Sequence, residues 1–322
     1  MPRIQHPKPE AAGPAGETPS PPPAVRPLRV LAGAFIGSAL LLTLGARFMD
    51  RHFIFFPDPH IEATPDVMGL PFEDVAFTAS DGVALHGWFI PAPRARTPAG
   101  APPFTFVMFH GNAGNISHRI DWAKLYRDRL GVNVFLFDYR GYGRSRGEPS
   151  EKGTYLDGEA AVKAMRARVD VDPARIVLAG HSLGAGVATE TALGEPPAGL
   201  ILESPFTSVA DIAKRAIPFL PVGLLLTTRY ETARKIAKVT CPVLVIHGDE
   251  DEVIPFEHGI KVYEAAPQPK TFFRLRGAMH NDTYLAGGEP YVQAYVRFLA
   301  ALEAKLPRSD PPSGGPVPVG ST

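Results

Sequence analysis

Uncharged apolar runs alternate with amphipathic stretches along the chain from about residue 70 onward. Strands that are buried on both faces have such continuous apolar sequences, which are typical of a mostly parallel sheet. A weaker final strand is expected at Phe272–Leu275. The main runs are Phe104–Phe109, Val132–Phe137, Ile176–Ala179, Leu200–Leu202 and Val243–Ile246.

A hairpin is expected before these runs, because Val75–Thr78 and Ala84–Ile90 flank the turn signal Ser80-Asp81-Gly82. Helical patterns fall between the later runs. An antiparallel start followed by alternating strands and helices predicts an α/β fold, with a mostly parallel central sheet flanked by helices. The expected helices lie around Arg119–Leu130, Tyr155–Val169, Ala185–Leu193, Glu257–Glu264 and Tyr291–Leu306.

The two ends of the chain differ from this pattern. Residues 1–27 and 307–322 are rich in proline and small residues, so they are expected to be disordered. Residues 28–48 are almost uncharged and long enough to cross the ~30 Å hydrocarbon layer as a helix. The predicted organisation is therefore a single transmembrane anchor at 28–48, a linker at 49–69 and one α/β domain at 70–306.

Arginines stand at both ends of the apolar segment, Arg26 and Arg29 at its start and Arg47 and Arg51 at its end. This near symmetry leaves open which side of the membrane holds the domain, with the N-terminus inside preferred. A cleaved secretory signal is the alternative. The long proline-rich stretch before the segment, and the lack of a clean Ala-x-Ala site after it, favour an uncleaved anchor.

Composition excludes several classes of protein. The chain has 322 residues with 33 basic and 33 acidic side chains, so it lacks the charge expected of a nucleic-acid-binding protein. Cys241 is the single cysteine, which excludes an intramolecular disulfide and a cysteine-based metal site. The sequence shows neither a metal-ligand spacing nor a glycine-rich phosphate loop, and we expect no metal and no cofactor.

One motif points to a chemistry. Gly180-His181-Ser182-Leu183-Gly184 joins an apolar strand to a helix of small residues. Strand, sharp turn and helix are the context in which G-x-S-x-G forms a nucleophile elbow. The turn places the Ser182 hydroxyl at a helix N-terminus, which favours a developing negative charge. A free serine hydroxyl is a poor nucleophile, so a base is expected nearby.

Three further strand ends carry polar groups, and the catalytic groups of such a sheet gather at the carboxyl ends of its strands. The glycine-rich turn at 110–115 exposes backbone N–H groups, and four consecutive acids occupy 249–252. His280 lies in the loop after the last strand, where a general base is expected. The residues alone leave several candidates for its carboxylate partner.

Together these segments resemble the α/β-hydrolase superfamily, and within it the membrane-anchored α/β-hydrolase-domain proteins related to serine aminopeptidase-like hydrolases. The resemblance spans residues 70–305, and FIFFPDP at 53–59 is similar to the junction between anchor and domain in those proteins. The matching motifs are HGNAGN at 110–115, DYRGYGRS at 138–145, GHSLG at 180–184, SPFTS at 204–208, HGDEDEVIP at 247–255 and GAMHND at 277–282.

The resemblance implies a Ser-His-Asp triad in the chain order Ser182, Asp251, His280, which is the order of α/β-hydrolases. Asp251 stands three residues past the turn at Gly248, and Asp249 is its nearest rival. The two glutamates of the same turn are expected to be solvated.

The same resemblance assigns the oxyanion hole to the backbone N–H groups of Asn112 and Leu183. It also implies a short lid insert at about 209–239. Tyr142, Phe206 and Leu224 are expected to contact the substrate, the last from an apolar stretch of the lid.

Several neighbouring residues are expected to be structural. His110, His181 and His247 each adjoin a glycine of the site, in loops that need internal hydrogen bonds. Asp138 and Arg140 are expected to brace the loop after the Val132–Phe137 run, as an ion pair.

The predicted function is that of a membrane-anchored serine hydrolase acting on small-molecule or lipid-like carboxylic esters or thioesters. The superfamily also includes depalmitoylases with a lipidated, cysteine-rich N-terminus, but this N-terminus has no cysteine and that substrate is not carried over. A peptidase or amidase of the serine aminopeptidase-like type and a non-catalytic membrane scaffold are the alternatives. The oligomeric state stays open.

Overall fold

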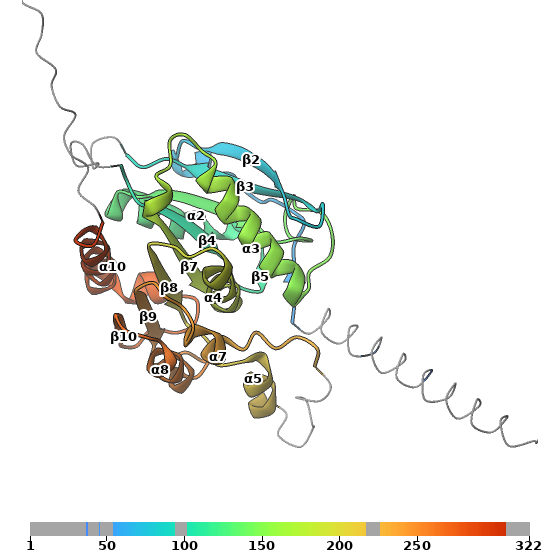
Figure 1. Cartoon of the computed structure of the whole chain (residues 1–322), viewed down its shortest axis with the longest axis vertical. Coiled ribbons are helices and arrows are strands. Elements are labelled where there is room, and N and C mark those ends of the chain that lie inside the picture. The colour runs from blue at the N-terminus through green and yellow to red at the C-terminus, as the bar shows by residue number, and fades with distance from the viewer. Residues whose placement is uncertain (1–36, 38–44, 46–53, 94–101, 217–225, 307–322) are drawn as a thin grey trace, which may run out of the picture. The chain divides into compact units, whose positions relative to one another are not determined.

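The computed structural model describes residues 37, 45, 54–93, 102–216 and 226–306. Its centre is an eight-stranded sheet in the order β10-β9-β8-β7-β4-β6-β3-β2 (Figure 1). All neighbours pair in parallel except β3, which is antiparallel to both β2 and β6. The strands are β2 Glu73–Thr78, β3 Ala84–Ile90, β4 Thr105–Phe109, β6 Asn133–Asp138, β7 Ile176–His181, β8 Gly199–Glu203, β9 Val243–Gly248 and β10 Lys270–Leu275.

Helices cover both faces of this sheet. One face packs against α3, α4, α7 and α8, and the other against α2 and α10, and each face has its own cluster of buried apolar side chains. The continuous apolar runs are therefore the middle strands, as their sequences predict. The helices are α2 Ile120–Leu125, α3 Glu151–Arg166, α4 Leu183–Gly194, α5 Val209–Ala216, α7 Thr232–Ile236, α8 Phe256–Ala265, α9 Thr283–Ala286 and α10 Gly288–Glu303.

The helix expected over Arg119–Leu130 is interrupted. Its first residue ends a 3-10 helix at Ile116–Arg119, α2 follows, and a π-helical turn covers Tyr126–Leu130. Two further 3-10 turns lie at Pro65–Met68 and Pro173–Arg175.

The linker predicted at 49–69 is wrong for the part that the structure describes. Strand β1, Phe56–Pro57, pairs in parallel with β5, Ala113–Gly114, next to the loop that follows β4. Phe55 is 3% exposed and belongs to the main apolar cluster. Residues 54–69 are thus part of the α/β domain.

The predicted anchor at 28–48 falls outside the described residues, apart from Gly37 and Gly45. So do the tails at 1–27 and 307–322. Among the helices that the structure describes, none is both long and apolar enough to span a bilayer. The ends of the expected lid insert form α5 and α7, and residues 217–225 between them are outside the description.

Candidate active site

Ser182 lies in the turn between β7 and α4, in a backbone conformation that side chains rarely adopt, with φ 55° and ψ −119°. Its N–H donates to the Glu203 carbonyl at the end of β8, at 3.0 Å. A Cβ at Gly180 would collide with the Gly184 carbonyl, and one at Gly184 with the Phe109 carbonyl. Only glycines therefore allow the turn that holds this hydroxyl above the sheet.

The structure brings His280 and Asp251 beside Ser182. The Nε2 atom of His280 is 3.0 Å from the Ser182 Oγ, and its Nδ1 is 2.8 Å from Oδ2 of Asp251. All three residues are nearly buried, with 8%, 8% and 5% of Ser182, Asp251 and His280 exposed. In this arrangement the imidazole can accept the serine proton, while the carboxylate keeps the other ring proton on Nδ1.

Both oxygens of Asp251 are fixed. Oδ1 accepts the backbone N–H groups of Val253 and Ile254 at 3.0 and 2.7 Å. Oδ2 faces His280 and lies 3.3 Å from Nε2 of His247. Burial raises the pKa of this carboxyl, but its hydrogen bonds with His247 and His280 outweigh burial, so the pKa lies well below its usual range. The group is an anion at neutral pH.

The rival acid has other partners. Asp249 accepts the Gly277 N–H at 2.7 Å and the Arg274 Nε–H at 2.8 Å, which braces the turn after β10. Glu252, expected to be solvated, is exposed but also accepts the backbone N–H of His280 at 3.0 Å. The geometry therefore favours Asp251 over Asp249 as the partner of His280.

The loop after β4 adjoins the same cavity. Asn112 and Leu183 both line the cavity in front of Ser182. Leu183 opens α4, so its N–H has no partner within the helix. The Asn112 carbonyl accepts hydrogen bonds from the Phe56 N–H at 3.0 Å and from the Tyr142 hydroxyl at 2.8 Å. These two bonds hold the backbone of the loop in place. The N–H groups of Asn112 and Leu183 stay the predicted donors to an oxyanion.

The side chains predicted to contact substrate differ in their placement. Phe206 lines the cavity, and Leu224 lies outside the described residues. The prediction for Tyr142 is wrong, because the side chain is fully buried behind the oxyanion loop, the loop at 110–115 that holds the predicted donor Asn112. Its ring packs edge-on against His110, with centroids 5.2 Å apart, and its hydroxyl holds Asn112. Tyr142 supports the loop without reaching the cavity.

Behind the elbow, His181 donates from Nε2 to the His280 carbonyl at 3.0 Å. Burial lowers the pKa of His181 to about 3, so the ring is neutral with Nδ1 unprotonated.

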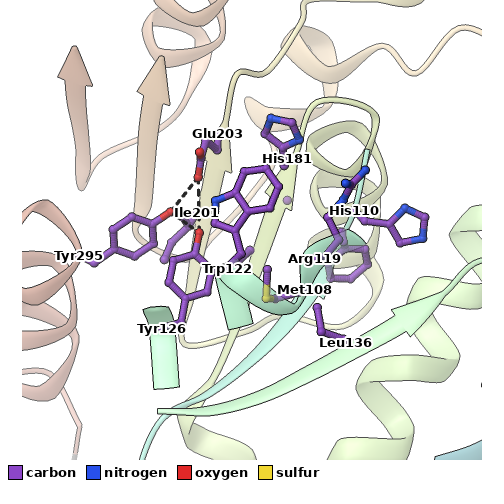
Figure 2. Close-up of a pocket in the computed structure, with 13 residues that line it drawn as sticks. Met108, His110, Arg119, Trp122, Tyr126, Leu136, His181, Ile201, Glu203 and Tyr295 are labelled. Carbon is purple, nitrogen blue, oxygen red and sulfur yellow. Dashed lines mark hydrogen bonds between the residues drawn. The ribbon is translucent and has the colours of Figure 1, made fainter. Parts of the chain in front are cut away.

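Figure 2 shows Glu203 in the same region, accepting hydrogen bonds from Tyr126 and Tyr295 at 3.5 and 3.0 Å. Burial raises the pKa of Glu203. No motif pointed to this carboxyl, which ties the end of β8 to α10.

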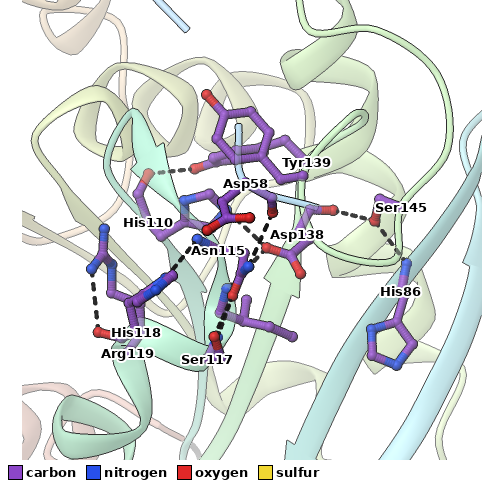
Figure 3. Close-up of polar contacts among 12 residues, drawn as sticks. Asp58, His86, His110, Asn115, Ser117, His118, Arg119, Asp138, Tyr139 and Ser145 are labelled. Carbon is purple, nitrogen blue, oxygen red and sulfur yellow. Dashed lines mark hydrogen bonds and ion pairs between the residues drawn. The ribbon is translucent and has the colours of Figure 1, made fainter. Parts of the chain in front are cut away.

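The loop after β6 does not contain the expected ion pair of Asp138 with Arg140. Arg140 instead binds Asp157 on α3 at 2.8 Å. Asp138 is fully buried, and Oδ1 lies 3.5 Å from Nε2 of His110, beneath the oxyanion loop (Figure 3). Burial raises the pKa of Asp138 to about 8, so this carboxyl is largely protonated at neutral pH.

A cavity of about 300 Å³ opens in front of Ser182. Its polar side holds Asn112, Arg119 and Asn281. Among the residues described in the cavity wall, Arg119 is the only one with a formal charge at neutral pH, and none is a carboxylate. The apolar side is formed by Ile54, Phe206, Val209, Ile212, Val253 and Ile254. Such a site suits a substrate with an apolar part and a short polar part.

The sequence predicts no metal site. The structure nevertheless brings together three side chains whose atoms could bind a metal ion. Asp58, Glu62 and His118 offer atoms within 4.8 Å of one another. His118 is already used there, since its Nδ1 accepts the Asn115 N–H at 3.1 Å and caps a short helix. The group lacks any further feature of a metal centre, and it does not line the cavity at Ser182.

Comparison with known proteins identifies the relatives of this chain. Residues 106–237 match the model of the alpha/beta hydrolase family. An uncharacterized protein of Mycobacterium tuberculosis is 38% identical over 266 residues, which cover 83% of this chain and 92% of that protein. The alpha/beta hydrolase domain-containing protein WAV2 of Arabidopsis thaliana is 37% identical over 266 residues, covering 77% of this chain and 84% of the relative.

A solved structure shares the fold. The esterase Pf2001 of Pyrococcus furiosus superposes with a TM-score of 0.60 at 22% identity. The match covers 76% of this chain and 98% of the esterase. At this identity the likeness concerns the architecture of the domain.

Proposed function

This chain belongs to the alpha/beta hydrolase family, and we propose that it is a serine hydrolase that cleaves carboxylic esters or thioesters. The observation that carries the proposal is the pair of contacts at His280, 3.0 Å to the Ser182 hydroxyl and 2.8 Å to the Asp251 carboxylate. These contacts lie in a buried position at the floor of an apolar-walled cavity.

The proposed reaction has two halves. Nε2 of His280 takes the proton of Ser182 as Oγ attacks the carbonyl carbon, and the N–H groups of Asn112 and Leu183 stabilise the oxyanion. The imidazolium then gives its proton to the leaving alcohol or thiol, which leaves an acyl-serine. Water, deprotonated by the same imidazole, hydrolyses the acyl-serine and restores the hydroxyl.

The polarity of the cavity separates this proposal from its main alternative. An aminopeptidase must hold the ammonium group of a peptide, which calls for an anionic or acceptor-rich pocket. Among the residues described in the cavity wall, Arg119 carries the formal charge, which is positive, and none is a carboxylate. The acyl group of an ester or thioester has no ammonium group to be bound, and it can lie along the apolar side of the cavity.

Attachment to a membrane is part of the proposal and rests on the sequence. Residues 28–48 form an apolar stretch of spanning length ahead of the domain. Ile54 and Phe55 follow shortly after it and pack in the domain, with Ile54 in the cavity wall. We propose that the stretch at 28–48 anchors the hydrolase domain to a membrane, where the substrates include lipid-like esters.

Turnover of p-nitrophenyl esters with two to twelve acyl carbons tests the proposed reaction, using full-length protein in detergent. The wild type is expected to hydrolyse the short and middle chain lengths. Ser182→Ala should lose several orders of magnitude in rate because the acyl acceptor is gone. Thr191→Ala is a matched control, since this buried hydroxyl lies on the same helix away from the cavity. Folded wild-type protein with no turnover above that of Ser182→Ala would contradict the proposal.

A further inference from the structure

We propose that Arg119 binds an anionic group of the substrate, so that the preferred substrates are esters carrying a carboxylate near the scissile bond. This inference rests on the proposed function and specifies its substrate class. The observation behind it is a guanidinium in the wall of the Ser182 cavity that lacks an acidic partner among the described residues.

The hydrogen bonds that hold Arg119 in place go to backbone carbonyls. It ends the 3-10 helix at Ile116–Arg119 and precedes α2. Its Nη1 donates to the His118 carbonyl at 3.2 Å (Figure 3). Its Nη2 donates to the Ala113 carbonyl at 2.8 Å. Its carbon atom Cζ lies 5.8 Å from the centre of the Trp122 ring. These contacts fix the guanidinium, and its positive charge has no anionic partner in the part of the chain that the structure describes.

The charge of Arg119 is not neutralised by Asp138 either. Asp138 is the carboxyl that interacts with the guanidinium electrostatically, but burial raises its pKa to about 8 and keeps it largely protonated at neutral pH. Burial lowers the pKa of Arg119, but a guanidinium is such a strong base that it stays protonated at neutral pH. Burial lowers the pKa of His181 to about 3, and the charge of Arg119 adds to this effect. The field of Arg119 therefore reaches the elbow.

An unpaired, half-buried cation is unfavourable for folding, and a carboxylate would relieve it. Each Nη atom carries two protons, and one hydrogen bond is present on each, so one N–H of each remains for a ligand. A carboxylate matches this planar group and needs one positive charge. A phosphate monoester would bring nearly two negative charges to a wall with one described cation.

The cavity has room for such a substrate. Its volume of about 300 Å³ lies at the lower end of the range of ~300–1,000 Å³ that is typical of small-molecule pockets. The apolar side, with Phe206 and Ile212, can hold the methylene chain of a dicarboxylic monoester while the carboxylate faces Arg119. A purely structural role, in which Arg119 only ties the loop between Ala113 and His118, would affect neutral and anionic substrates alike.

The test compares isosteric substrates that differ in one charge. Monomethyl adipate is set against methyl adipamate, so the charge lies on the acyl side. The pair 4-carboxyphenyl acetate and 4-carbamoylphenyl acetate places it on the leaving group. The ratio of kcat/KM for carboxylate over amide is measured for full-length wild type, Arg119→Met, Arg119→Lys and the control Arg127→Met. Arg127 also donates to a backbone carbonyl, that of Pro91, but lies outside the cavity wall.

Arg119→Met should reduce the ratio at least about tenfold in one of the two substrate pairs, mainly through KM, because charge-assisted hydrogen bonds are lost. Arg119→Lys should recover part of it, and Arg127→Met should leave it unchanged. In wild type, raising NaCl from 0.05 to 0.5 M should lower the ratio by screening, a readout that does not depend on any variant folding.

The inference would be overturned if the kcat/KM ratio were the same in wild type and Arg119→Met for both substrate pairs. It would also be overturned if the wild-type ratio did not change with NaCl concentration. Equal losses on carboxylate and amide substrates would show a structural role and would overturn it as well. Failure of the proposed function looks different: wild type would then hydrolyse neither member of either pair faster than Ser182→Ala.

Discussion

Replacing Asp251 with asparagine removes one charge from the candidate triad while keeping the shape of the side chain. In the native arrangement Oδ2 accepts the Nδ1 proton of His280 at 2.8 Å, and Oδ1 accepts the N–H groups of Val253 and Ile254. Every one of these partners is a donor. An amide offers one acceptor and one donor group, so neither of its two orientations can satisfy all of them.

If the amide nitrogen faces His280, it forces the imidazole proton onto Nε2, and the ring can no longer accept the proton of Ser182. Loss of the correct tautomer by this change reduces kcat by about 10⁴ in a well-characterised protease triad, and we expect a loss of that order here. If the nitrogen instead faces Ile254, the N–H groups of Val253 and Ile254 lose their acceptor. The loss costs about 1–3 kcal/mol for the buried Ile254 group, and less for that of the half-exposed Val253.

The matched control is Asp249→Asn, two residues earlier in the same turn. Asp249 accepts from Gly277 N and Arg274 Nε, and an amide oxygen can keep one of these bonds. Its kcat should stay within about threefold of wild type, as for most surface substitutions. The assay is kcat for p-nitrophenyl butyrate, with the melting temperature measured alongside. Equal losses in the two variants, or a larger loss at Asp249, would refute the assignment of the acid.

Two further predictions concern stability and the membrane. Burial raises the pKa of Asp138 to about 8 in the folded protein, against about 3.9 in an unfolded chain. Between these two pH values the folded protein holds a proton that the unfolded chain has lost. The wild type therefore loses stability as the pH rises from about 4 to about 8. The melting temperature of Asp138→Asn should fall less than that of wild type between pH 5 and 8, and parallel pH curves would contradict this. Deletion of residues 1–48 should give a soluble domain that hydrolyses p-nitrophenyl acetate at the full-length rate, because each catalytic candidate lies beyond residue 109. Full-length protein of intact mass in the soluble fraction would contradict the anchor.

Local sequence was sufficient to predict most of the α/β architecture and the turn that holds Ser182. The elbow depends on neighbouring residues, two glycines and a strand that passes into a helix, and the structure has them where the sequence places them. His280 could be proposed because it follows an apolar strand, and parallel strands bring their carboxyl ends to one edge of the sheet. The choice of Asp251 among four consecutive acids depended on the resemblance to α/β-hydrolases.

Contacts between distant segments could not be predicted in this way. Arg140 lies 17 residues before its partner Asp157, and the nearer Asp138 looked equally suitable in the sequence. Strand β1 is only two residues long, so it has no periodic pattern, and its pairing with β5 follows from the tertiary fold. The burial of Tyr142 and the exposure of Arg119 to the cavity likewise depend on how three loops meet.

The central claim is that Ser182 is the nucleophile, and covalent labelling tests it most directly. Full-length protein is incubated with a fluorophosphonate, digested, and analysed by mass spectrometry, with Ser182→Ala and Asp249→Asn treated in parallel. We predict one phosphonyl group per wild-type chain, on the peptide that contains Ser182. The Asp249→Asn variant should be labelled to the same extent, and the Ser182→Ala variant should carry no label. Folded wild-type protein that stays unlabelled, or a label on another residue that persists in Ser182→Ala, would contradict the account.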